Sequence, residues 1–346
     1  MTDSNVYPIF PEGCQSLLSK YLNKDVFEAL KNKTTSNGFT LQQVINSGVV
    51  NPDSGIGIYA GDAESYTTFA ALFDPIIAEY HDFGKNDSHS SHLNPDDLNA
   101  ENPDPAGDYI VSTRIRVGRN FANLPLGPAI SRQQRKVVEQ QTAEALNSLS
   151  DNLAGVYYPL EGMNETQQAT LIADHFLFKA GDRFLEAAGL NRDWPEGRGI
   201  FHNHEKTFLV WINEEDQLRI ISMQQGGDIK QAFTRLCDAL AQIGQKLDFA
   251  YNEHLGFISS CPTNLGTSMR ASVHIKLPKL AADMAKFKSI ADQHYLQIRG
   301  IHGEHSESEG GVYDVSNKRR LGISEVDAVQ GLYDGVVALI AAEKGL

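Results

Sequence analysis

The sequence has few cysteines, and they are not spaced to build a disulfide framework or a zinc site. Cysteine occurs three times in 346 residues, at Cys14, Cys237 and Cys261, without a CxxC pair. Zinc sites use closely spaced cysteine pairs, and disulfide scaffolds use a larger, even number of cysteines. The sequence also lacks a basic and apolar leader at its start, and any run of the roughly 18 apolar residues that cross a bilayer. These absences predict a cytoplasmic protein in a reducing compartment, with no membrane partner.

Two further absences exclude classes of nucleotide-binding and nucleic-acid-binding protein. No GxxxxGK[ST] loop and no VAIK, HRD or DFG set occurs, which excludes the usual phosphate-loop and protein-kinase architectures. Positive charge is in deficit, with 30 Lys and Arg against 44 Asp and Glu and a formal net charge of −14. An acidic surface repels nucleic acid, so we expect no nucleic-acid partner, and a local group of arginines then indicates a bound anion.

The composition is that of a globular protein, and its arrangement predicts two domains. With 346 residues, 41% hydrophobic and 21% charged, the chain is long enough to bury two cores. The stretch 85–108 is rich in Asn, Asp, Ser and Pro, which is typical of a linker. Before it, in residues 1–84, the segments 15–31 and 66–80 have apolar residues at helical spacing. We therefore expect a small helical domain at the N-terminus.

The remaining residues, 109–346, mix strand and helix patterns. Strands are expected at 109–117, 207–212, 218–223, 256–260, 270–277 and 295–301, and helices at 132–149, 228–247 and 324–344. Only residues 213–217 separate two of these strands, which is short enough to demand an antiparallel hairpin. The predicted fold class is therefore α+β, with the helical domain followed by a larger domain built on an antiparallel sheet with packed helices.

Two of the expected strands place basic side chains on one face. Because side chains alternate along a strand, the first presents Ser112, Arg114 and Arg116 together. Its other face is expected to pack on the core through Val111, Thr113, Ile115 and Val117. The later strand repeats the pattern with Arg270, Ser272, His274 and Lys276, and Arg219 and Arg299 are further candidates. In either strand alone, the polar side chains are explained by a half-buried strand that turns one face to water. Several arginines on one sheet face, however, repel one another unless an anion such as a triphosphate lies among them.

Acidic turns and a cysteine loop add to these arginines. Glu214 and Glu215 lie in the hairpin turn, and Glu304 lies in the glycine-rich stretch 303–311. Carboxylates on turns are usually only solvated. Cys261 stands in a Pro- and Gly-marked loop that leads to Arg270, a setting that is expected to lower the pKa of the thiol and hold a thiolate.

At these residues the sequence resembles the phosphagen (guanidino) kinases. The segments that match are STRIRVGRN, NEEDQLRIISMQQGGD, CPTNLGTSMRASVHI and GGVYDVSNKRRLG, and the resemblance runs over nearly the whole chain. It implies a helical N-terminal domain, an antiparallel sheet of about eight strands in the larger domain, and reversible, Mg²⁺-dependent phosphoryl transfer from ATP to a guanidino group, a reaction that buffers ATP. It also implies that the ATP phosphates are bound by Arg114, Arg116, Arg219, Arg270 and Arg299.

The same resemblance implies further roles for single residues. The nucleoside side would be contacted by Ser112, His175, His274 and Asp314. Glu215 and Glu304 would grip the guanidinium, with Cys261 beside it, and these are the expected catalytic residues. Mg²⁺ would be held by phosphates and water without a direct protein ligand, with Glu214 acting through a water. We expect Glu215 to accept the proton, because its short hairpin is more rigid than the 300–311 lid.

The resemblance also implies an acceptor. The loop 51–60 and the lid sequence GEHSESEGG resemble those of the members that phosphorylate arginine. The amino-acid end would then be held by Ser54, Gly55, Ile56, Gly57 and Tyr59, since glycines let backbone N–H groups approach a carboxylate. Asp53 and Arg183 match positions that pair between the domains, while His302 departs from an arginine found in some members. Alternatives stay open: another guanidino acceptor (lombricine, taurocyamine or creatine), a catalytically silent nucleotide-binding paralogue, and a monomer or a homodimer.

Overall fold

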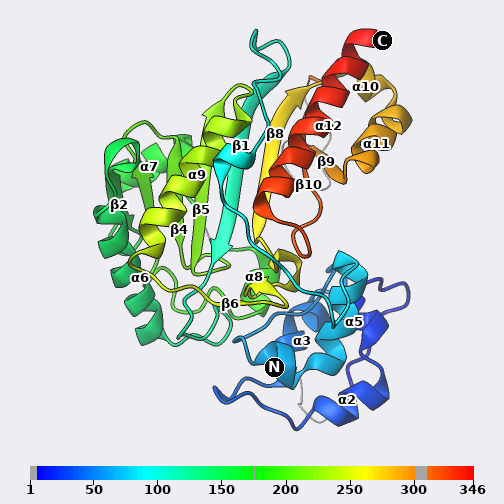
Figure 1. Ribbon diagram of the computed structural model, residues 1–346. Helices are drawn as coiled ribbons and strands as arrows, with labels where there is room; N and C mark the ends of the chain where they lie inside the picture. Colours follow the sequence, from blue (N-terminus) through cyan, green and yellow to red (C-terminus); the bar gives the residue numbers. More distant parts are fainter. Residues whose placement is uncertain (1–5, 175, 179, 301–309) are drawn as a thin grey trace.

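The computed structural model describes residues 6–174, 176–178, 180–300 and 310–346. It has a small helical part and a larger part with a sheet, joined by a long connecting segment (Figure 1). The predicted α+β fold class is confirmed. Within the described ranges no helix is both long and apolar enough to cross a membrane.

The N-terminal part is helical, although its helices are shorter than the sequence pattern indicated. They are α1 (Leu17–Tyr21), α2 (Lys24–Leu30), α3 (Leu41–Val50), α4 (Ser65–Thr68) and α5 (Ala70–His81). The segment 15–31 is divided because the side chain of Asn23 accepts a hydrogen bond from the N–H of Val26 and starts a new helix. The segment 66–80 is divided at Phe69, whose φ of −109° and ψ of 27° lie outside the helical range.

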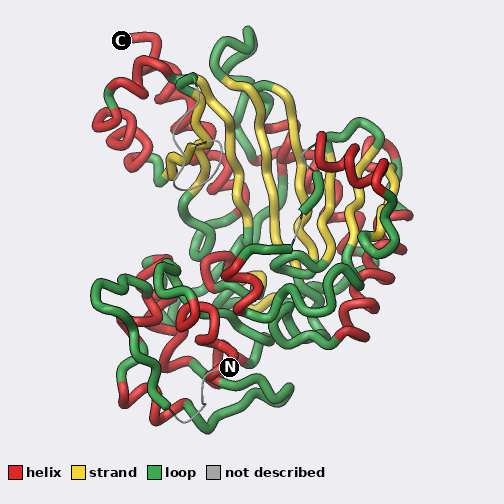
Figure 2. Tube along the Cα trace, turned by 180° about the vertical axis from the view of Figure 1, so that it is seen from behind, coloured by secondary structure: helices red, strands yellow, loops and turns green. Residues whose placement is uncertain are grey.

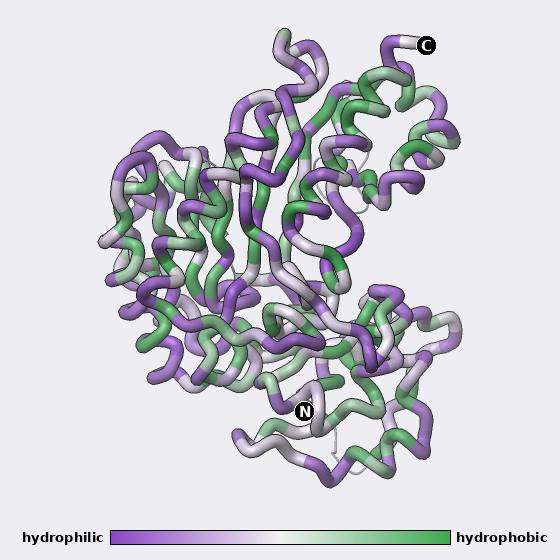
Figure 3. The backbone as a smooth tube through the Cα atoms, in the orientation of Figure 1, coloured by the Kyte–Doolittle hydropathy of each residue, from purple (hydrophilic) through white to green (hydrophobic). Residues whose placement is uncertain are grey.

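The connecting segment 85–108 lies along the larger part and is mostly hydrophilic (Figure 3). It contains the short helix η1 (Pro95–Asp97). The buried carboxylate of Glu325 accepts hydrogen bonds from Ser91 Oγ at 3.0 Å and from the His92 N–H at 2.7 Å. Such contacts hold the segment against the larger part.

The larger part is built on an eight-stranded sheet. Its strands are β1 (Ile110–Arg119), β2 (Gly155–Pro159), β3 (Gly199–Asn203), β4 (Phe208–Ile212), β5 (Leu218–Gln225), β8 (Met269–Lys276), β9 (Leu296–Gly300) and β10 (Val312–Asn317). Their order is β2-β3-β4-β5-β1-β8-β10-β9, and every neighbouring pair is antiparallel. The predicted antiparallel sheet is confirmed, with β4 and β5 as its predicted hairpin.

One predicted strand is mostly wrong. Of the segment 256–260, only β7 (Gly256–Phe257) is a strand, and it pairs with β6 (Tyr251–Asn252) outside the main sheet. The chain leaves the strand because the carbonyls of Ser259 and Ser260 bond to the N-terminal part instead of a strand neighbour.

Most helices of the larger part cover one face of the sheet, and on the other face, within the described residues, the segment around Leu171 packs over β3, β4 and β5 only. The helices of the larger part are α6 (Arg132–Asn147), η2 (Asp151–Leu153), α7 (Glu165–Ala173), α8 (Arg183–Ala187), α9 (Ile229–Gly244), η3 (Pro262–Asn264), α10 (Pro278–Ala282), α11 (Met284–Gln293) and α12 (Glu325–Gly345). Helix α9 packs on β1 and β5, and α12 packs on β8 and β10 (Figure 1). Figure 2 shows the opposite face, where no helix lies over the central strands.

The register of β1 decides which side chains reach this open face. From Thr113 on, alternate residues of β1 are buried, as predicted. The prediction that Val111 faces the core is wrong, since its side chain is 51% exposed. The register between β1 and β8 shifts between Ile110 and Ser112, and a bulge of this kind moves one residue off the regular alternation.

Two hydrophobic clusters fill most of the interior. One lies between the sheet and its helices. The other belongs to the N-terminal part but also includes Leu190, Ile258, Cys261 and Leu265 of the larger part. Apolar packing thus joins the two parts where Cys261 lies, and the division of the chain at 1–84, 85–108 and 109–346 stays a prediction.

Candidate active site

Arginines from three neighbouring strands meet on the open face of the sheet. Arg116 on β1 stands opposite Arg270 on β8, and Arg219 lies on β5, on the other side of β1. These three line one small cavity together with Arg320. Arg114 lies two residues before Arg116 and therefore on the same face. We call these five residues the arginine cluster.

Arg320 was not predicted as a site residue. It follows β10 in the sequence, and its Nη1 donates hydrogen bonds to the carbonyl of Thr263 at 2.8 Å and to Asn264 Oδ1 at 2.5 Å. A sequence signal was present, because two consecutive arginines follow a strand closely. Only the fold shows that this turn reaches Arg270.

The charges of the cluster are only partly neutralised by the protein. Repulsion from Arg219, followed by burial, lowers the pKa of Arg116 well below its usual value. Burial, followed by the same repulsion, lowers the pKa of Arg114 to about 10. Glu214 and Glu215 each pair with Arg219 at 2.9 Å, but Arg116 forms no ion pair in the described part of the chain. Guanidinium groups held together in this way are suited to bind a polyanion.

Buried N–H groups in the cluster also lack acceptors. Among the described residues, the Nε atoms of Arg114, Arg270 and Arg320 are buried and make no hydrogen bond. Asp314 accepts a hydrogen bond from Arg270 at 2.7 Å through Oδ2. Because buried donors are rarely left unpaired, phosphate oxygens are fitting partners for these groups.

Arg299 and Asp314 come from the edge of the sheet. They are cross-strand partners on β9 and β10, and Asp314 is also opposite His274 on β8. Repulsion from Arg299 is one of the causes, after burial, that lower the pKa of Arg320. The fold thus brings both predicted residues next to the arginine cluster.

A cavity of about 420 Å³ adjoins the cluster. It is lined by the predicted Ser112, Arg114 and His274, and by Phe176 and Met223. Burial lowers the pKa of His274, which favours the neutral ring. A cavity with an aromatic ring, a thioether and a few polar groups has the lining expected for a purine nucleoside.

The two carboxylates of the β4–β5 hairpin lie at the edge of the cluster. Arg198 Nε donates to the carbonyl of Asn213 at 3.1 Å and anchors the start of the turn. The side chain of Glu215 is only 15% exposed, and burial, partly offset by Arg219, raises its pKa to about 7. A carboxylate with this pKa is suited to act as a general base at neutral pH.

Cys261 lies near Glu215, but its thiol does not have the predicted low pKa. Its side chain is 6% exposed, and Sγ is 3.1 Å from Thr263 Oγ1. Burial, followed by the negative charge of Glu215, raises the pKa of Cys261 to about 12. The prediction was wrong because it considered the sequence neighbour Arg270, whereas the fold buries the thiol and exposes it to the negative charge of Glu215.

We call the loop 51–60 of the N-terminal part the glycine loop. Its Tyr59 lies near Cys261 and Glu215. Its side chain is 7% exposed. Burial, followed by the nearby Cys261 and Glu215, raises its pKa, so the phenol is protonated. The loop, the carboxylate and the cysteine therefore lie close to one another.

The glycine loop offers backbone donors at this place. In the described part of the chain, the N–H groups of Gly55, Ile56 and Gly57 donate no hydrogen bond, whereas Ser54 N–H bonds to Asn51 at 3.0 Å. Backbone N–H groups without an intramolecular acceptor are suited to donate to an anion such as a carboxylate.

The loop is also tied to the larger part. Arg183 Nη1 donates to Asp53 Oδ1 at 2.8 Å. The two residues form the ion pair expected from the resemblance, between the glycine loop and α8. Both side chains are exposed, so the pair is expected to hold the loop in place more than to stabilise the fold.

We expect Gly57→Ala to destabilise the loop. Gly57 has a φ of +81°, and an added Cβ would lie 2.9 Å from Leu18 Cβ and 3.2 Å from Gly48 Cα. Strain and overlap together should cost about 1–3 kcal/mol of unfolding free energy, measured by thermal or urea unfolding. Gly55→Ala is the matched control, because nothing lies within 4 Å of its added Cβ. Equal stability of the two variants would contradict this reasoning.

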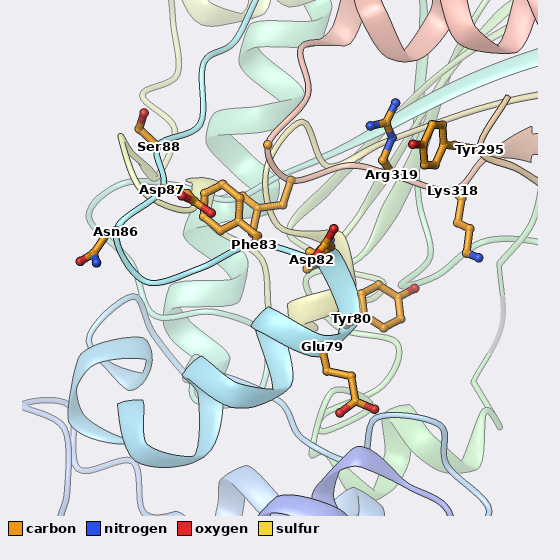
Figure 4. A pocket seen from close by; sticks show the side chains of 13 residues that line it. Glu79, Tyr80, Asp82, Phe83, Asn86, Asp87, Ser88, Tyr295, Lys318 and Arg319 are labelled. Carbon is orange, nitrogen blue, oxygen red and sulfur yellow. The ribbon is translucent and has the colours of Figure 1, made fainter. Parts of the chain in front are cut away.

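A separate cavity of about 740 Å³ lies where the two parts of the protein meet (Figure 4). Tyr80 and Asp82 line it from the end of α5, and Lys318 and Arg319 line it from the larger part. The Arg319 guanidinium lies 3.7 Å from the centre of the Tyr295 ring. None of the predicted site residues lines this cavity.

Some predicted residues fall outside the described part of the chain. These are His175, Glu304 and His302. Among the described residues, no group of three or more His, Cys, Asp or Glu is arranged to hold a metal ion. Glu214 pairs with Arg219, and it also accepts a hydrogen bond from the Glu215 N–H at 2.8 Å.

Family models match both parts of the chain. Residues 12–78 match the N-terminal domain of ATP:guanido phosphotransferases, and residues 137–346 match their C-terminal catalytic domain. An arginine kinase of Plodia interpunctella is 55% identical over 333 residues, which covers 96% of this chain and 94% of the relative. An arginine kinase of Limulus polyphemus is 55% identical over 332 residues, which covers 96% of this chain and 93% of the relative.

Solved structures share the fold over the same length. A lombricine kinase has a TM-score of 0.91 and 40% identity, covering 100% of this chain and 96% of that one. A duplicated taurocyamine kinase from Schistosoma mansoni has a TM-score of 0.90 and 44% identity, covering 96% of this chain and 48% of that one. The arginine kinases above are thus more similar in sequence to this chain than these two structures are.

Proposed function

Since this chain belongs to the ATP:guanido phosphotransferase family, we propose that it transfers the γ-phosphoryl group of ATP reversibly to the guanidino group of free L-arginine. The products are ADP and phosphoarginine, and the reaction would buffer ATP. The acceptor rests on one observation, the 55% identity to proteins named arginine kinase over 96% of the chain. We propose that the enzyme works in the cytoplasm, as a monomer or a homodimer, which light scattering would decide.

The arginine cluster would bind the ATP phosphates, with Arg299 at its edge. Its uncompensated charge and unpaired N–H groups support this role. Ser112, His274 and Asp314, with His175, would contact the nucleoside. Bound Mg²⁺ would neutralise charge on the phosphates, and Glu214 would help to hold it through a water. Fixed positive groups around the transferred phosphoryl stabilise its charge without reorganisation.

Glu215 would act as the general base. The guanidino nitrogen loses a proton to Glu215 as its bond to the γ-phosphorus forms, and the bond from that phosphorus to the β–γ bridging oxygen breaks, which releases ADP. The raised pKa of Glu215 supports this assignment. Glu304 would hold the other side of the guanidinium. The loop of Ser54, Gly55, Ile56 and Gly57, with the Tyr59 hydroxyl, would bind the amino-acid end.

A bound guanidinium would also change the state of Cys261. Its positive charge between Glu215 and the thiol would remove the repulsion that now raises the thiol pKa. The pKa of Cys261 would then fall, and a thiolate would form only in the complex with the acceptor.

A panel of acceptors tests the proposed reaction. We expect ADP formation from Mg-ATP with arginine, and at least tenfold lower kcat/KM with lombricine, taurocyamine, creatine or glycocyamine, because one misplaced group in a pocket costs at least that factor. A reaction without acceptor is the control. Turnover with another acceptor alone would keep the family chemistry and reject arginine. Nucleotide binding without turnover on the whole panel would indicate a silent paralogue.

A further inference from the structure

The carbonyl groups before Cys261 are held by donors from the N-terminal part. The Ser259 carbonyl accepts a hydrogen bond from the Tyr66 hydroxyl at 2.7 Å. The Ser260 carbonyl accepts one from the Ala60 N–H, also at 2.7 Å. These bonds draw the chain away from the sheet just before the cysteine.

His81 holds the carbonyl directly after Cys261. Its Nε2 is 2.8 Å from the carbonyl oxygen of Pro262. The ring is 8% exposed, and burial lowers its pKa to about 4, so it is neutral at physiological pH. Because a carbonyl can only accept, the proton of the neutral ring lies on Nε2.

The other side of the same loop is held by the arginine cluster. Arg320 Nη1 donates to the Thr263 carbonyl at 2.8 Å, and Thr263 Oγ1 is 3.1 Å from Cys261 Sγ. The loop of the cysteine is thus fixed between His81 at the end of α5 and a residue beside the proposed phosphate site.

We propose that His81 is a positioning residue, through which the N-terminal part sets the Cys261 thiol against the guanidino acceptor. His81 touches neither substrate, and it acts through the Pro262 carbonyl. The inference rests on the proposed guanidino kinase reaction, because it assigns the cysteine to the acceptor side. The proposed role of His81 therefore concerns the guanidino acceptor, whereas the arginine cluster would bind the nucleotide.

The chemistry of this contact predicts a selective effect. Without the Nε2–H donor, the buried Pro262 carbonyl loses its side-chain partner, and the loop can relax. A small displacement of a group that aligns a substrate lowers reactivity strongly. The thiol should also become more accessible, since Cys261 is now 6% exposed.

The test compares His81→Phe, which lacks the donor, with His81→Gln, whose amide nitrogen can replace Nε2–H. We expect His81→Phe to raise the KM for arginine about tenfold and to change the KM for Mg-ATP less than twofold. Iodoacetamide should modify Cys261 about tenfold faster, measured by mass spectrometry with Cys14 and Cys237 as internal references. His81→Gln should restore both values to within about threefold of wild type.

Further variants separate positioning from folding. Tyr66→Phe removes one hydroxyl next to the same loop and should change arginine KM and alkylation in the same direction. His254→Phe is the control, because His254 bonds to Asp87 and not to the cysteine loop. Equal loss for both substrates in His81→Phe, or unchanged alkylation of Cys261, would overturn the inference. If wild type does not use arginine, the proposed function fails, but the alkylation rates still decide whether His81 holds the loop.

Discussion

Glu215→Gln is expected to lower kcat with arginine by about 10²–10⁴-fold, which is the usual contribution of a general base. Glutamine has nearly the same size, and its Oε1 can still accept the hydrogen bond that Arg219 Nη2 now donates at 2.9 Å. The geometry of the hairpin should therefore be kept, and only the ability to take a proton is lost. Mg-ATP binding, measured by calorimetry, should stay close to wild type.

The pH dependence gives the same assignment a second readout. With the Glu215 pKa at about 7, kcat/KM for arginine should fall below about pH 7 in the wild type, because the base becomes protonated. This limb should be absent in Glu215→Gln. Glu196→Gln, on the surface beside Lys136, is the control and should keep both kcat and the pH profile. A Glu215→Gln variant with near-normal turnover would reject Glu215 as the base.

The raised pKa of Glu215 also predicts how the free energy of unfolding changes with pH. The pKa of Glu215 is raised from 4.5 to about 7 in the folded state, so the charged form is disfavoured by folding. The wild type therefore loses stability as pH rises from about 4.5 to 7, and the penalty is complete above that range. Glu215→Gln should gain stability over wild type at pH 8 and little at pH 4.5, as urea unfolding would show.

Local patterns were enough to predict β1, β4, β5, β8 and β9 and the basic face of the sheet, but not β2, β3 and β10. The alternation in β8 and the short turn between β4 and β5 depend only on neighbouring residues. Arg114, Arg116 and Arg270 could therefore be placed on one face before the fold was known. The bulge that turns Val111 outward could not, since it arises from the register with another strand.

The missed features depend on contacts between distant segments. Arg320 joins the cluster because the turn after β10 bonds to Thr263, which no spacing in the sequence indicates. The thiol pKa of Cys261 is raised by burial and then by Glu215, which lies 46 positions earlier in the chain. The contact of His81 with Pro262 spans 181 positions. In each case the sequence contains the residue but does not show which distant residue it contacts.

Arg116→Met should make the protein more stable and the enzyme nearly inactive. Repulsion from Arg219 and burial lower the pKa of Arg116. The folded state therefore disfavours the charged form of this side chain. Replacing a half-buried, poorly compensated charge by an apolar side chain of similar length should raise the free energy of unfolding by about 1–2 kcal/mol. The loss of one phosphate donor should lower kcat by about 10²–10³-fold.

Bound Mg-ADP should make the wild type more stable than Arg116→Met, which is the reverse of the order without nucleotide. A ligand that binds the folded state stabilises it in proportion to its affinity, and the wild type should bind Mg-ADP more tightly than Arg116→Met. Thermal unfolding with and without Mg-ADP measures both effects, and Arg132→Met, an exposed arginine paired with Glu196, is the control with a Tm close to wild type. A lower Tm for Arg116→Met in the absence of nucleotide would mean that the protein itself balances the cluster. The argument that these arginines are arranged for a polyanion would then fail.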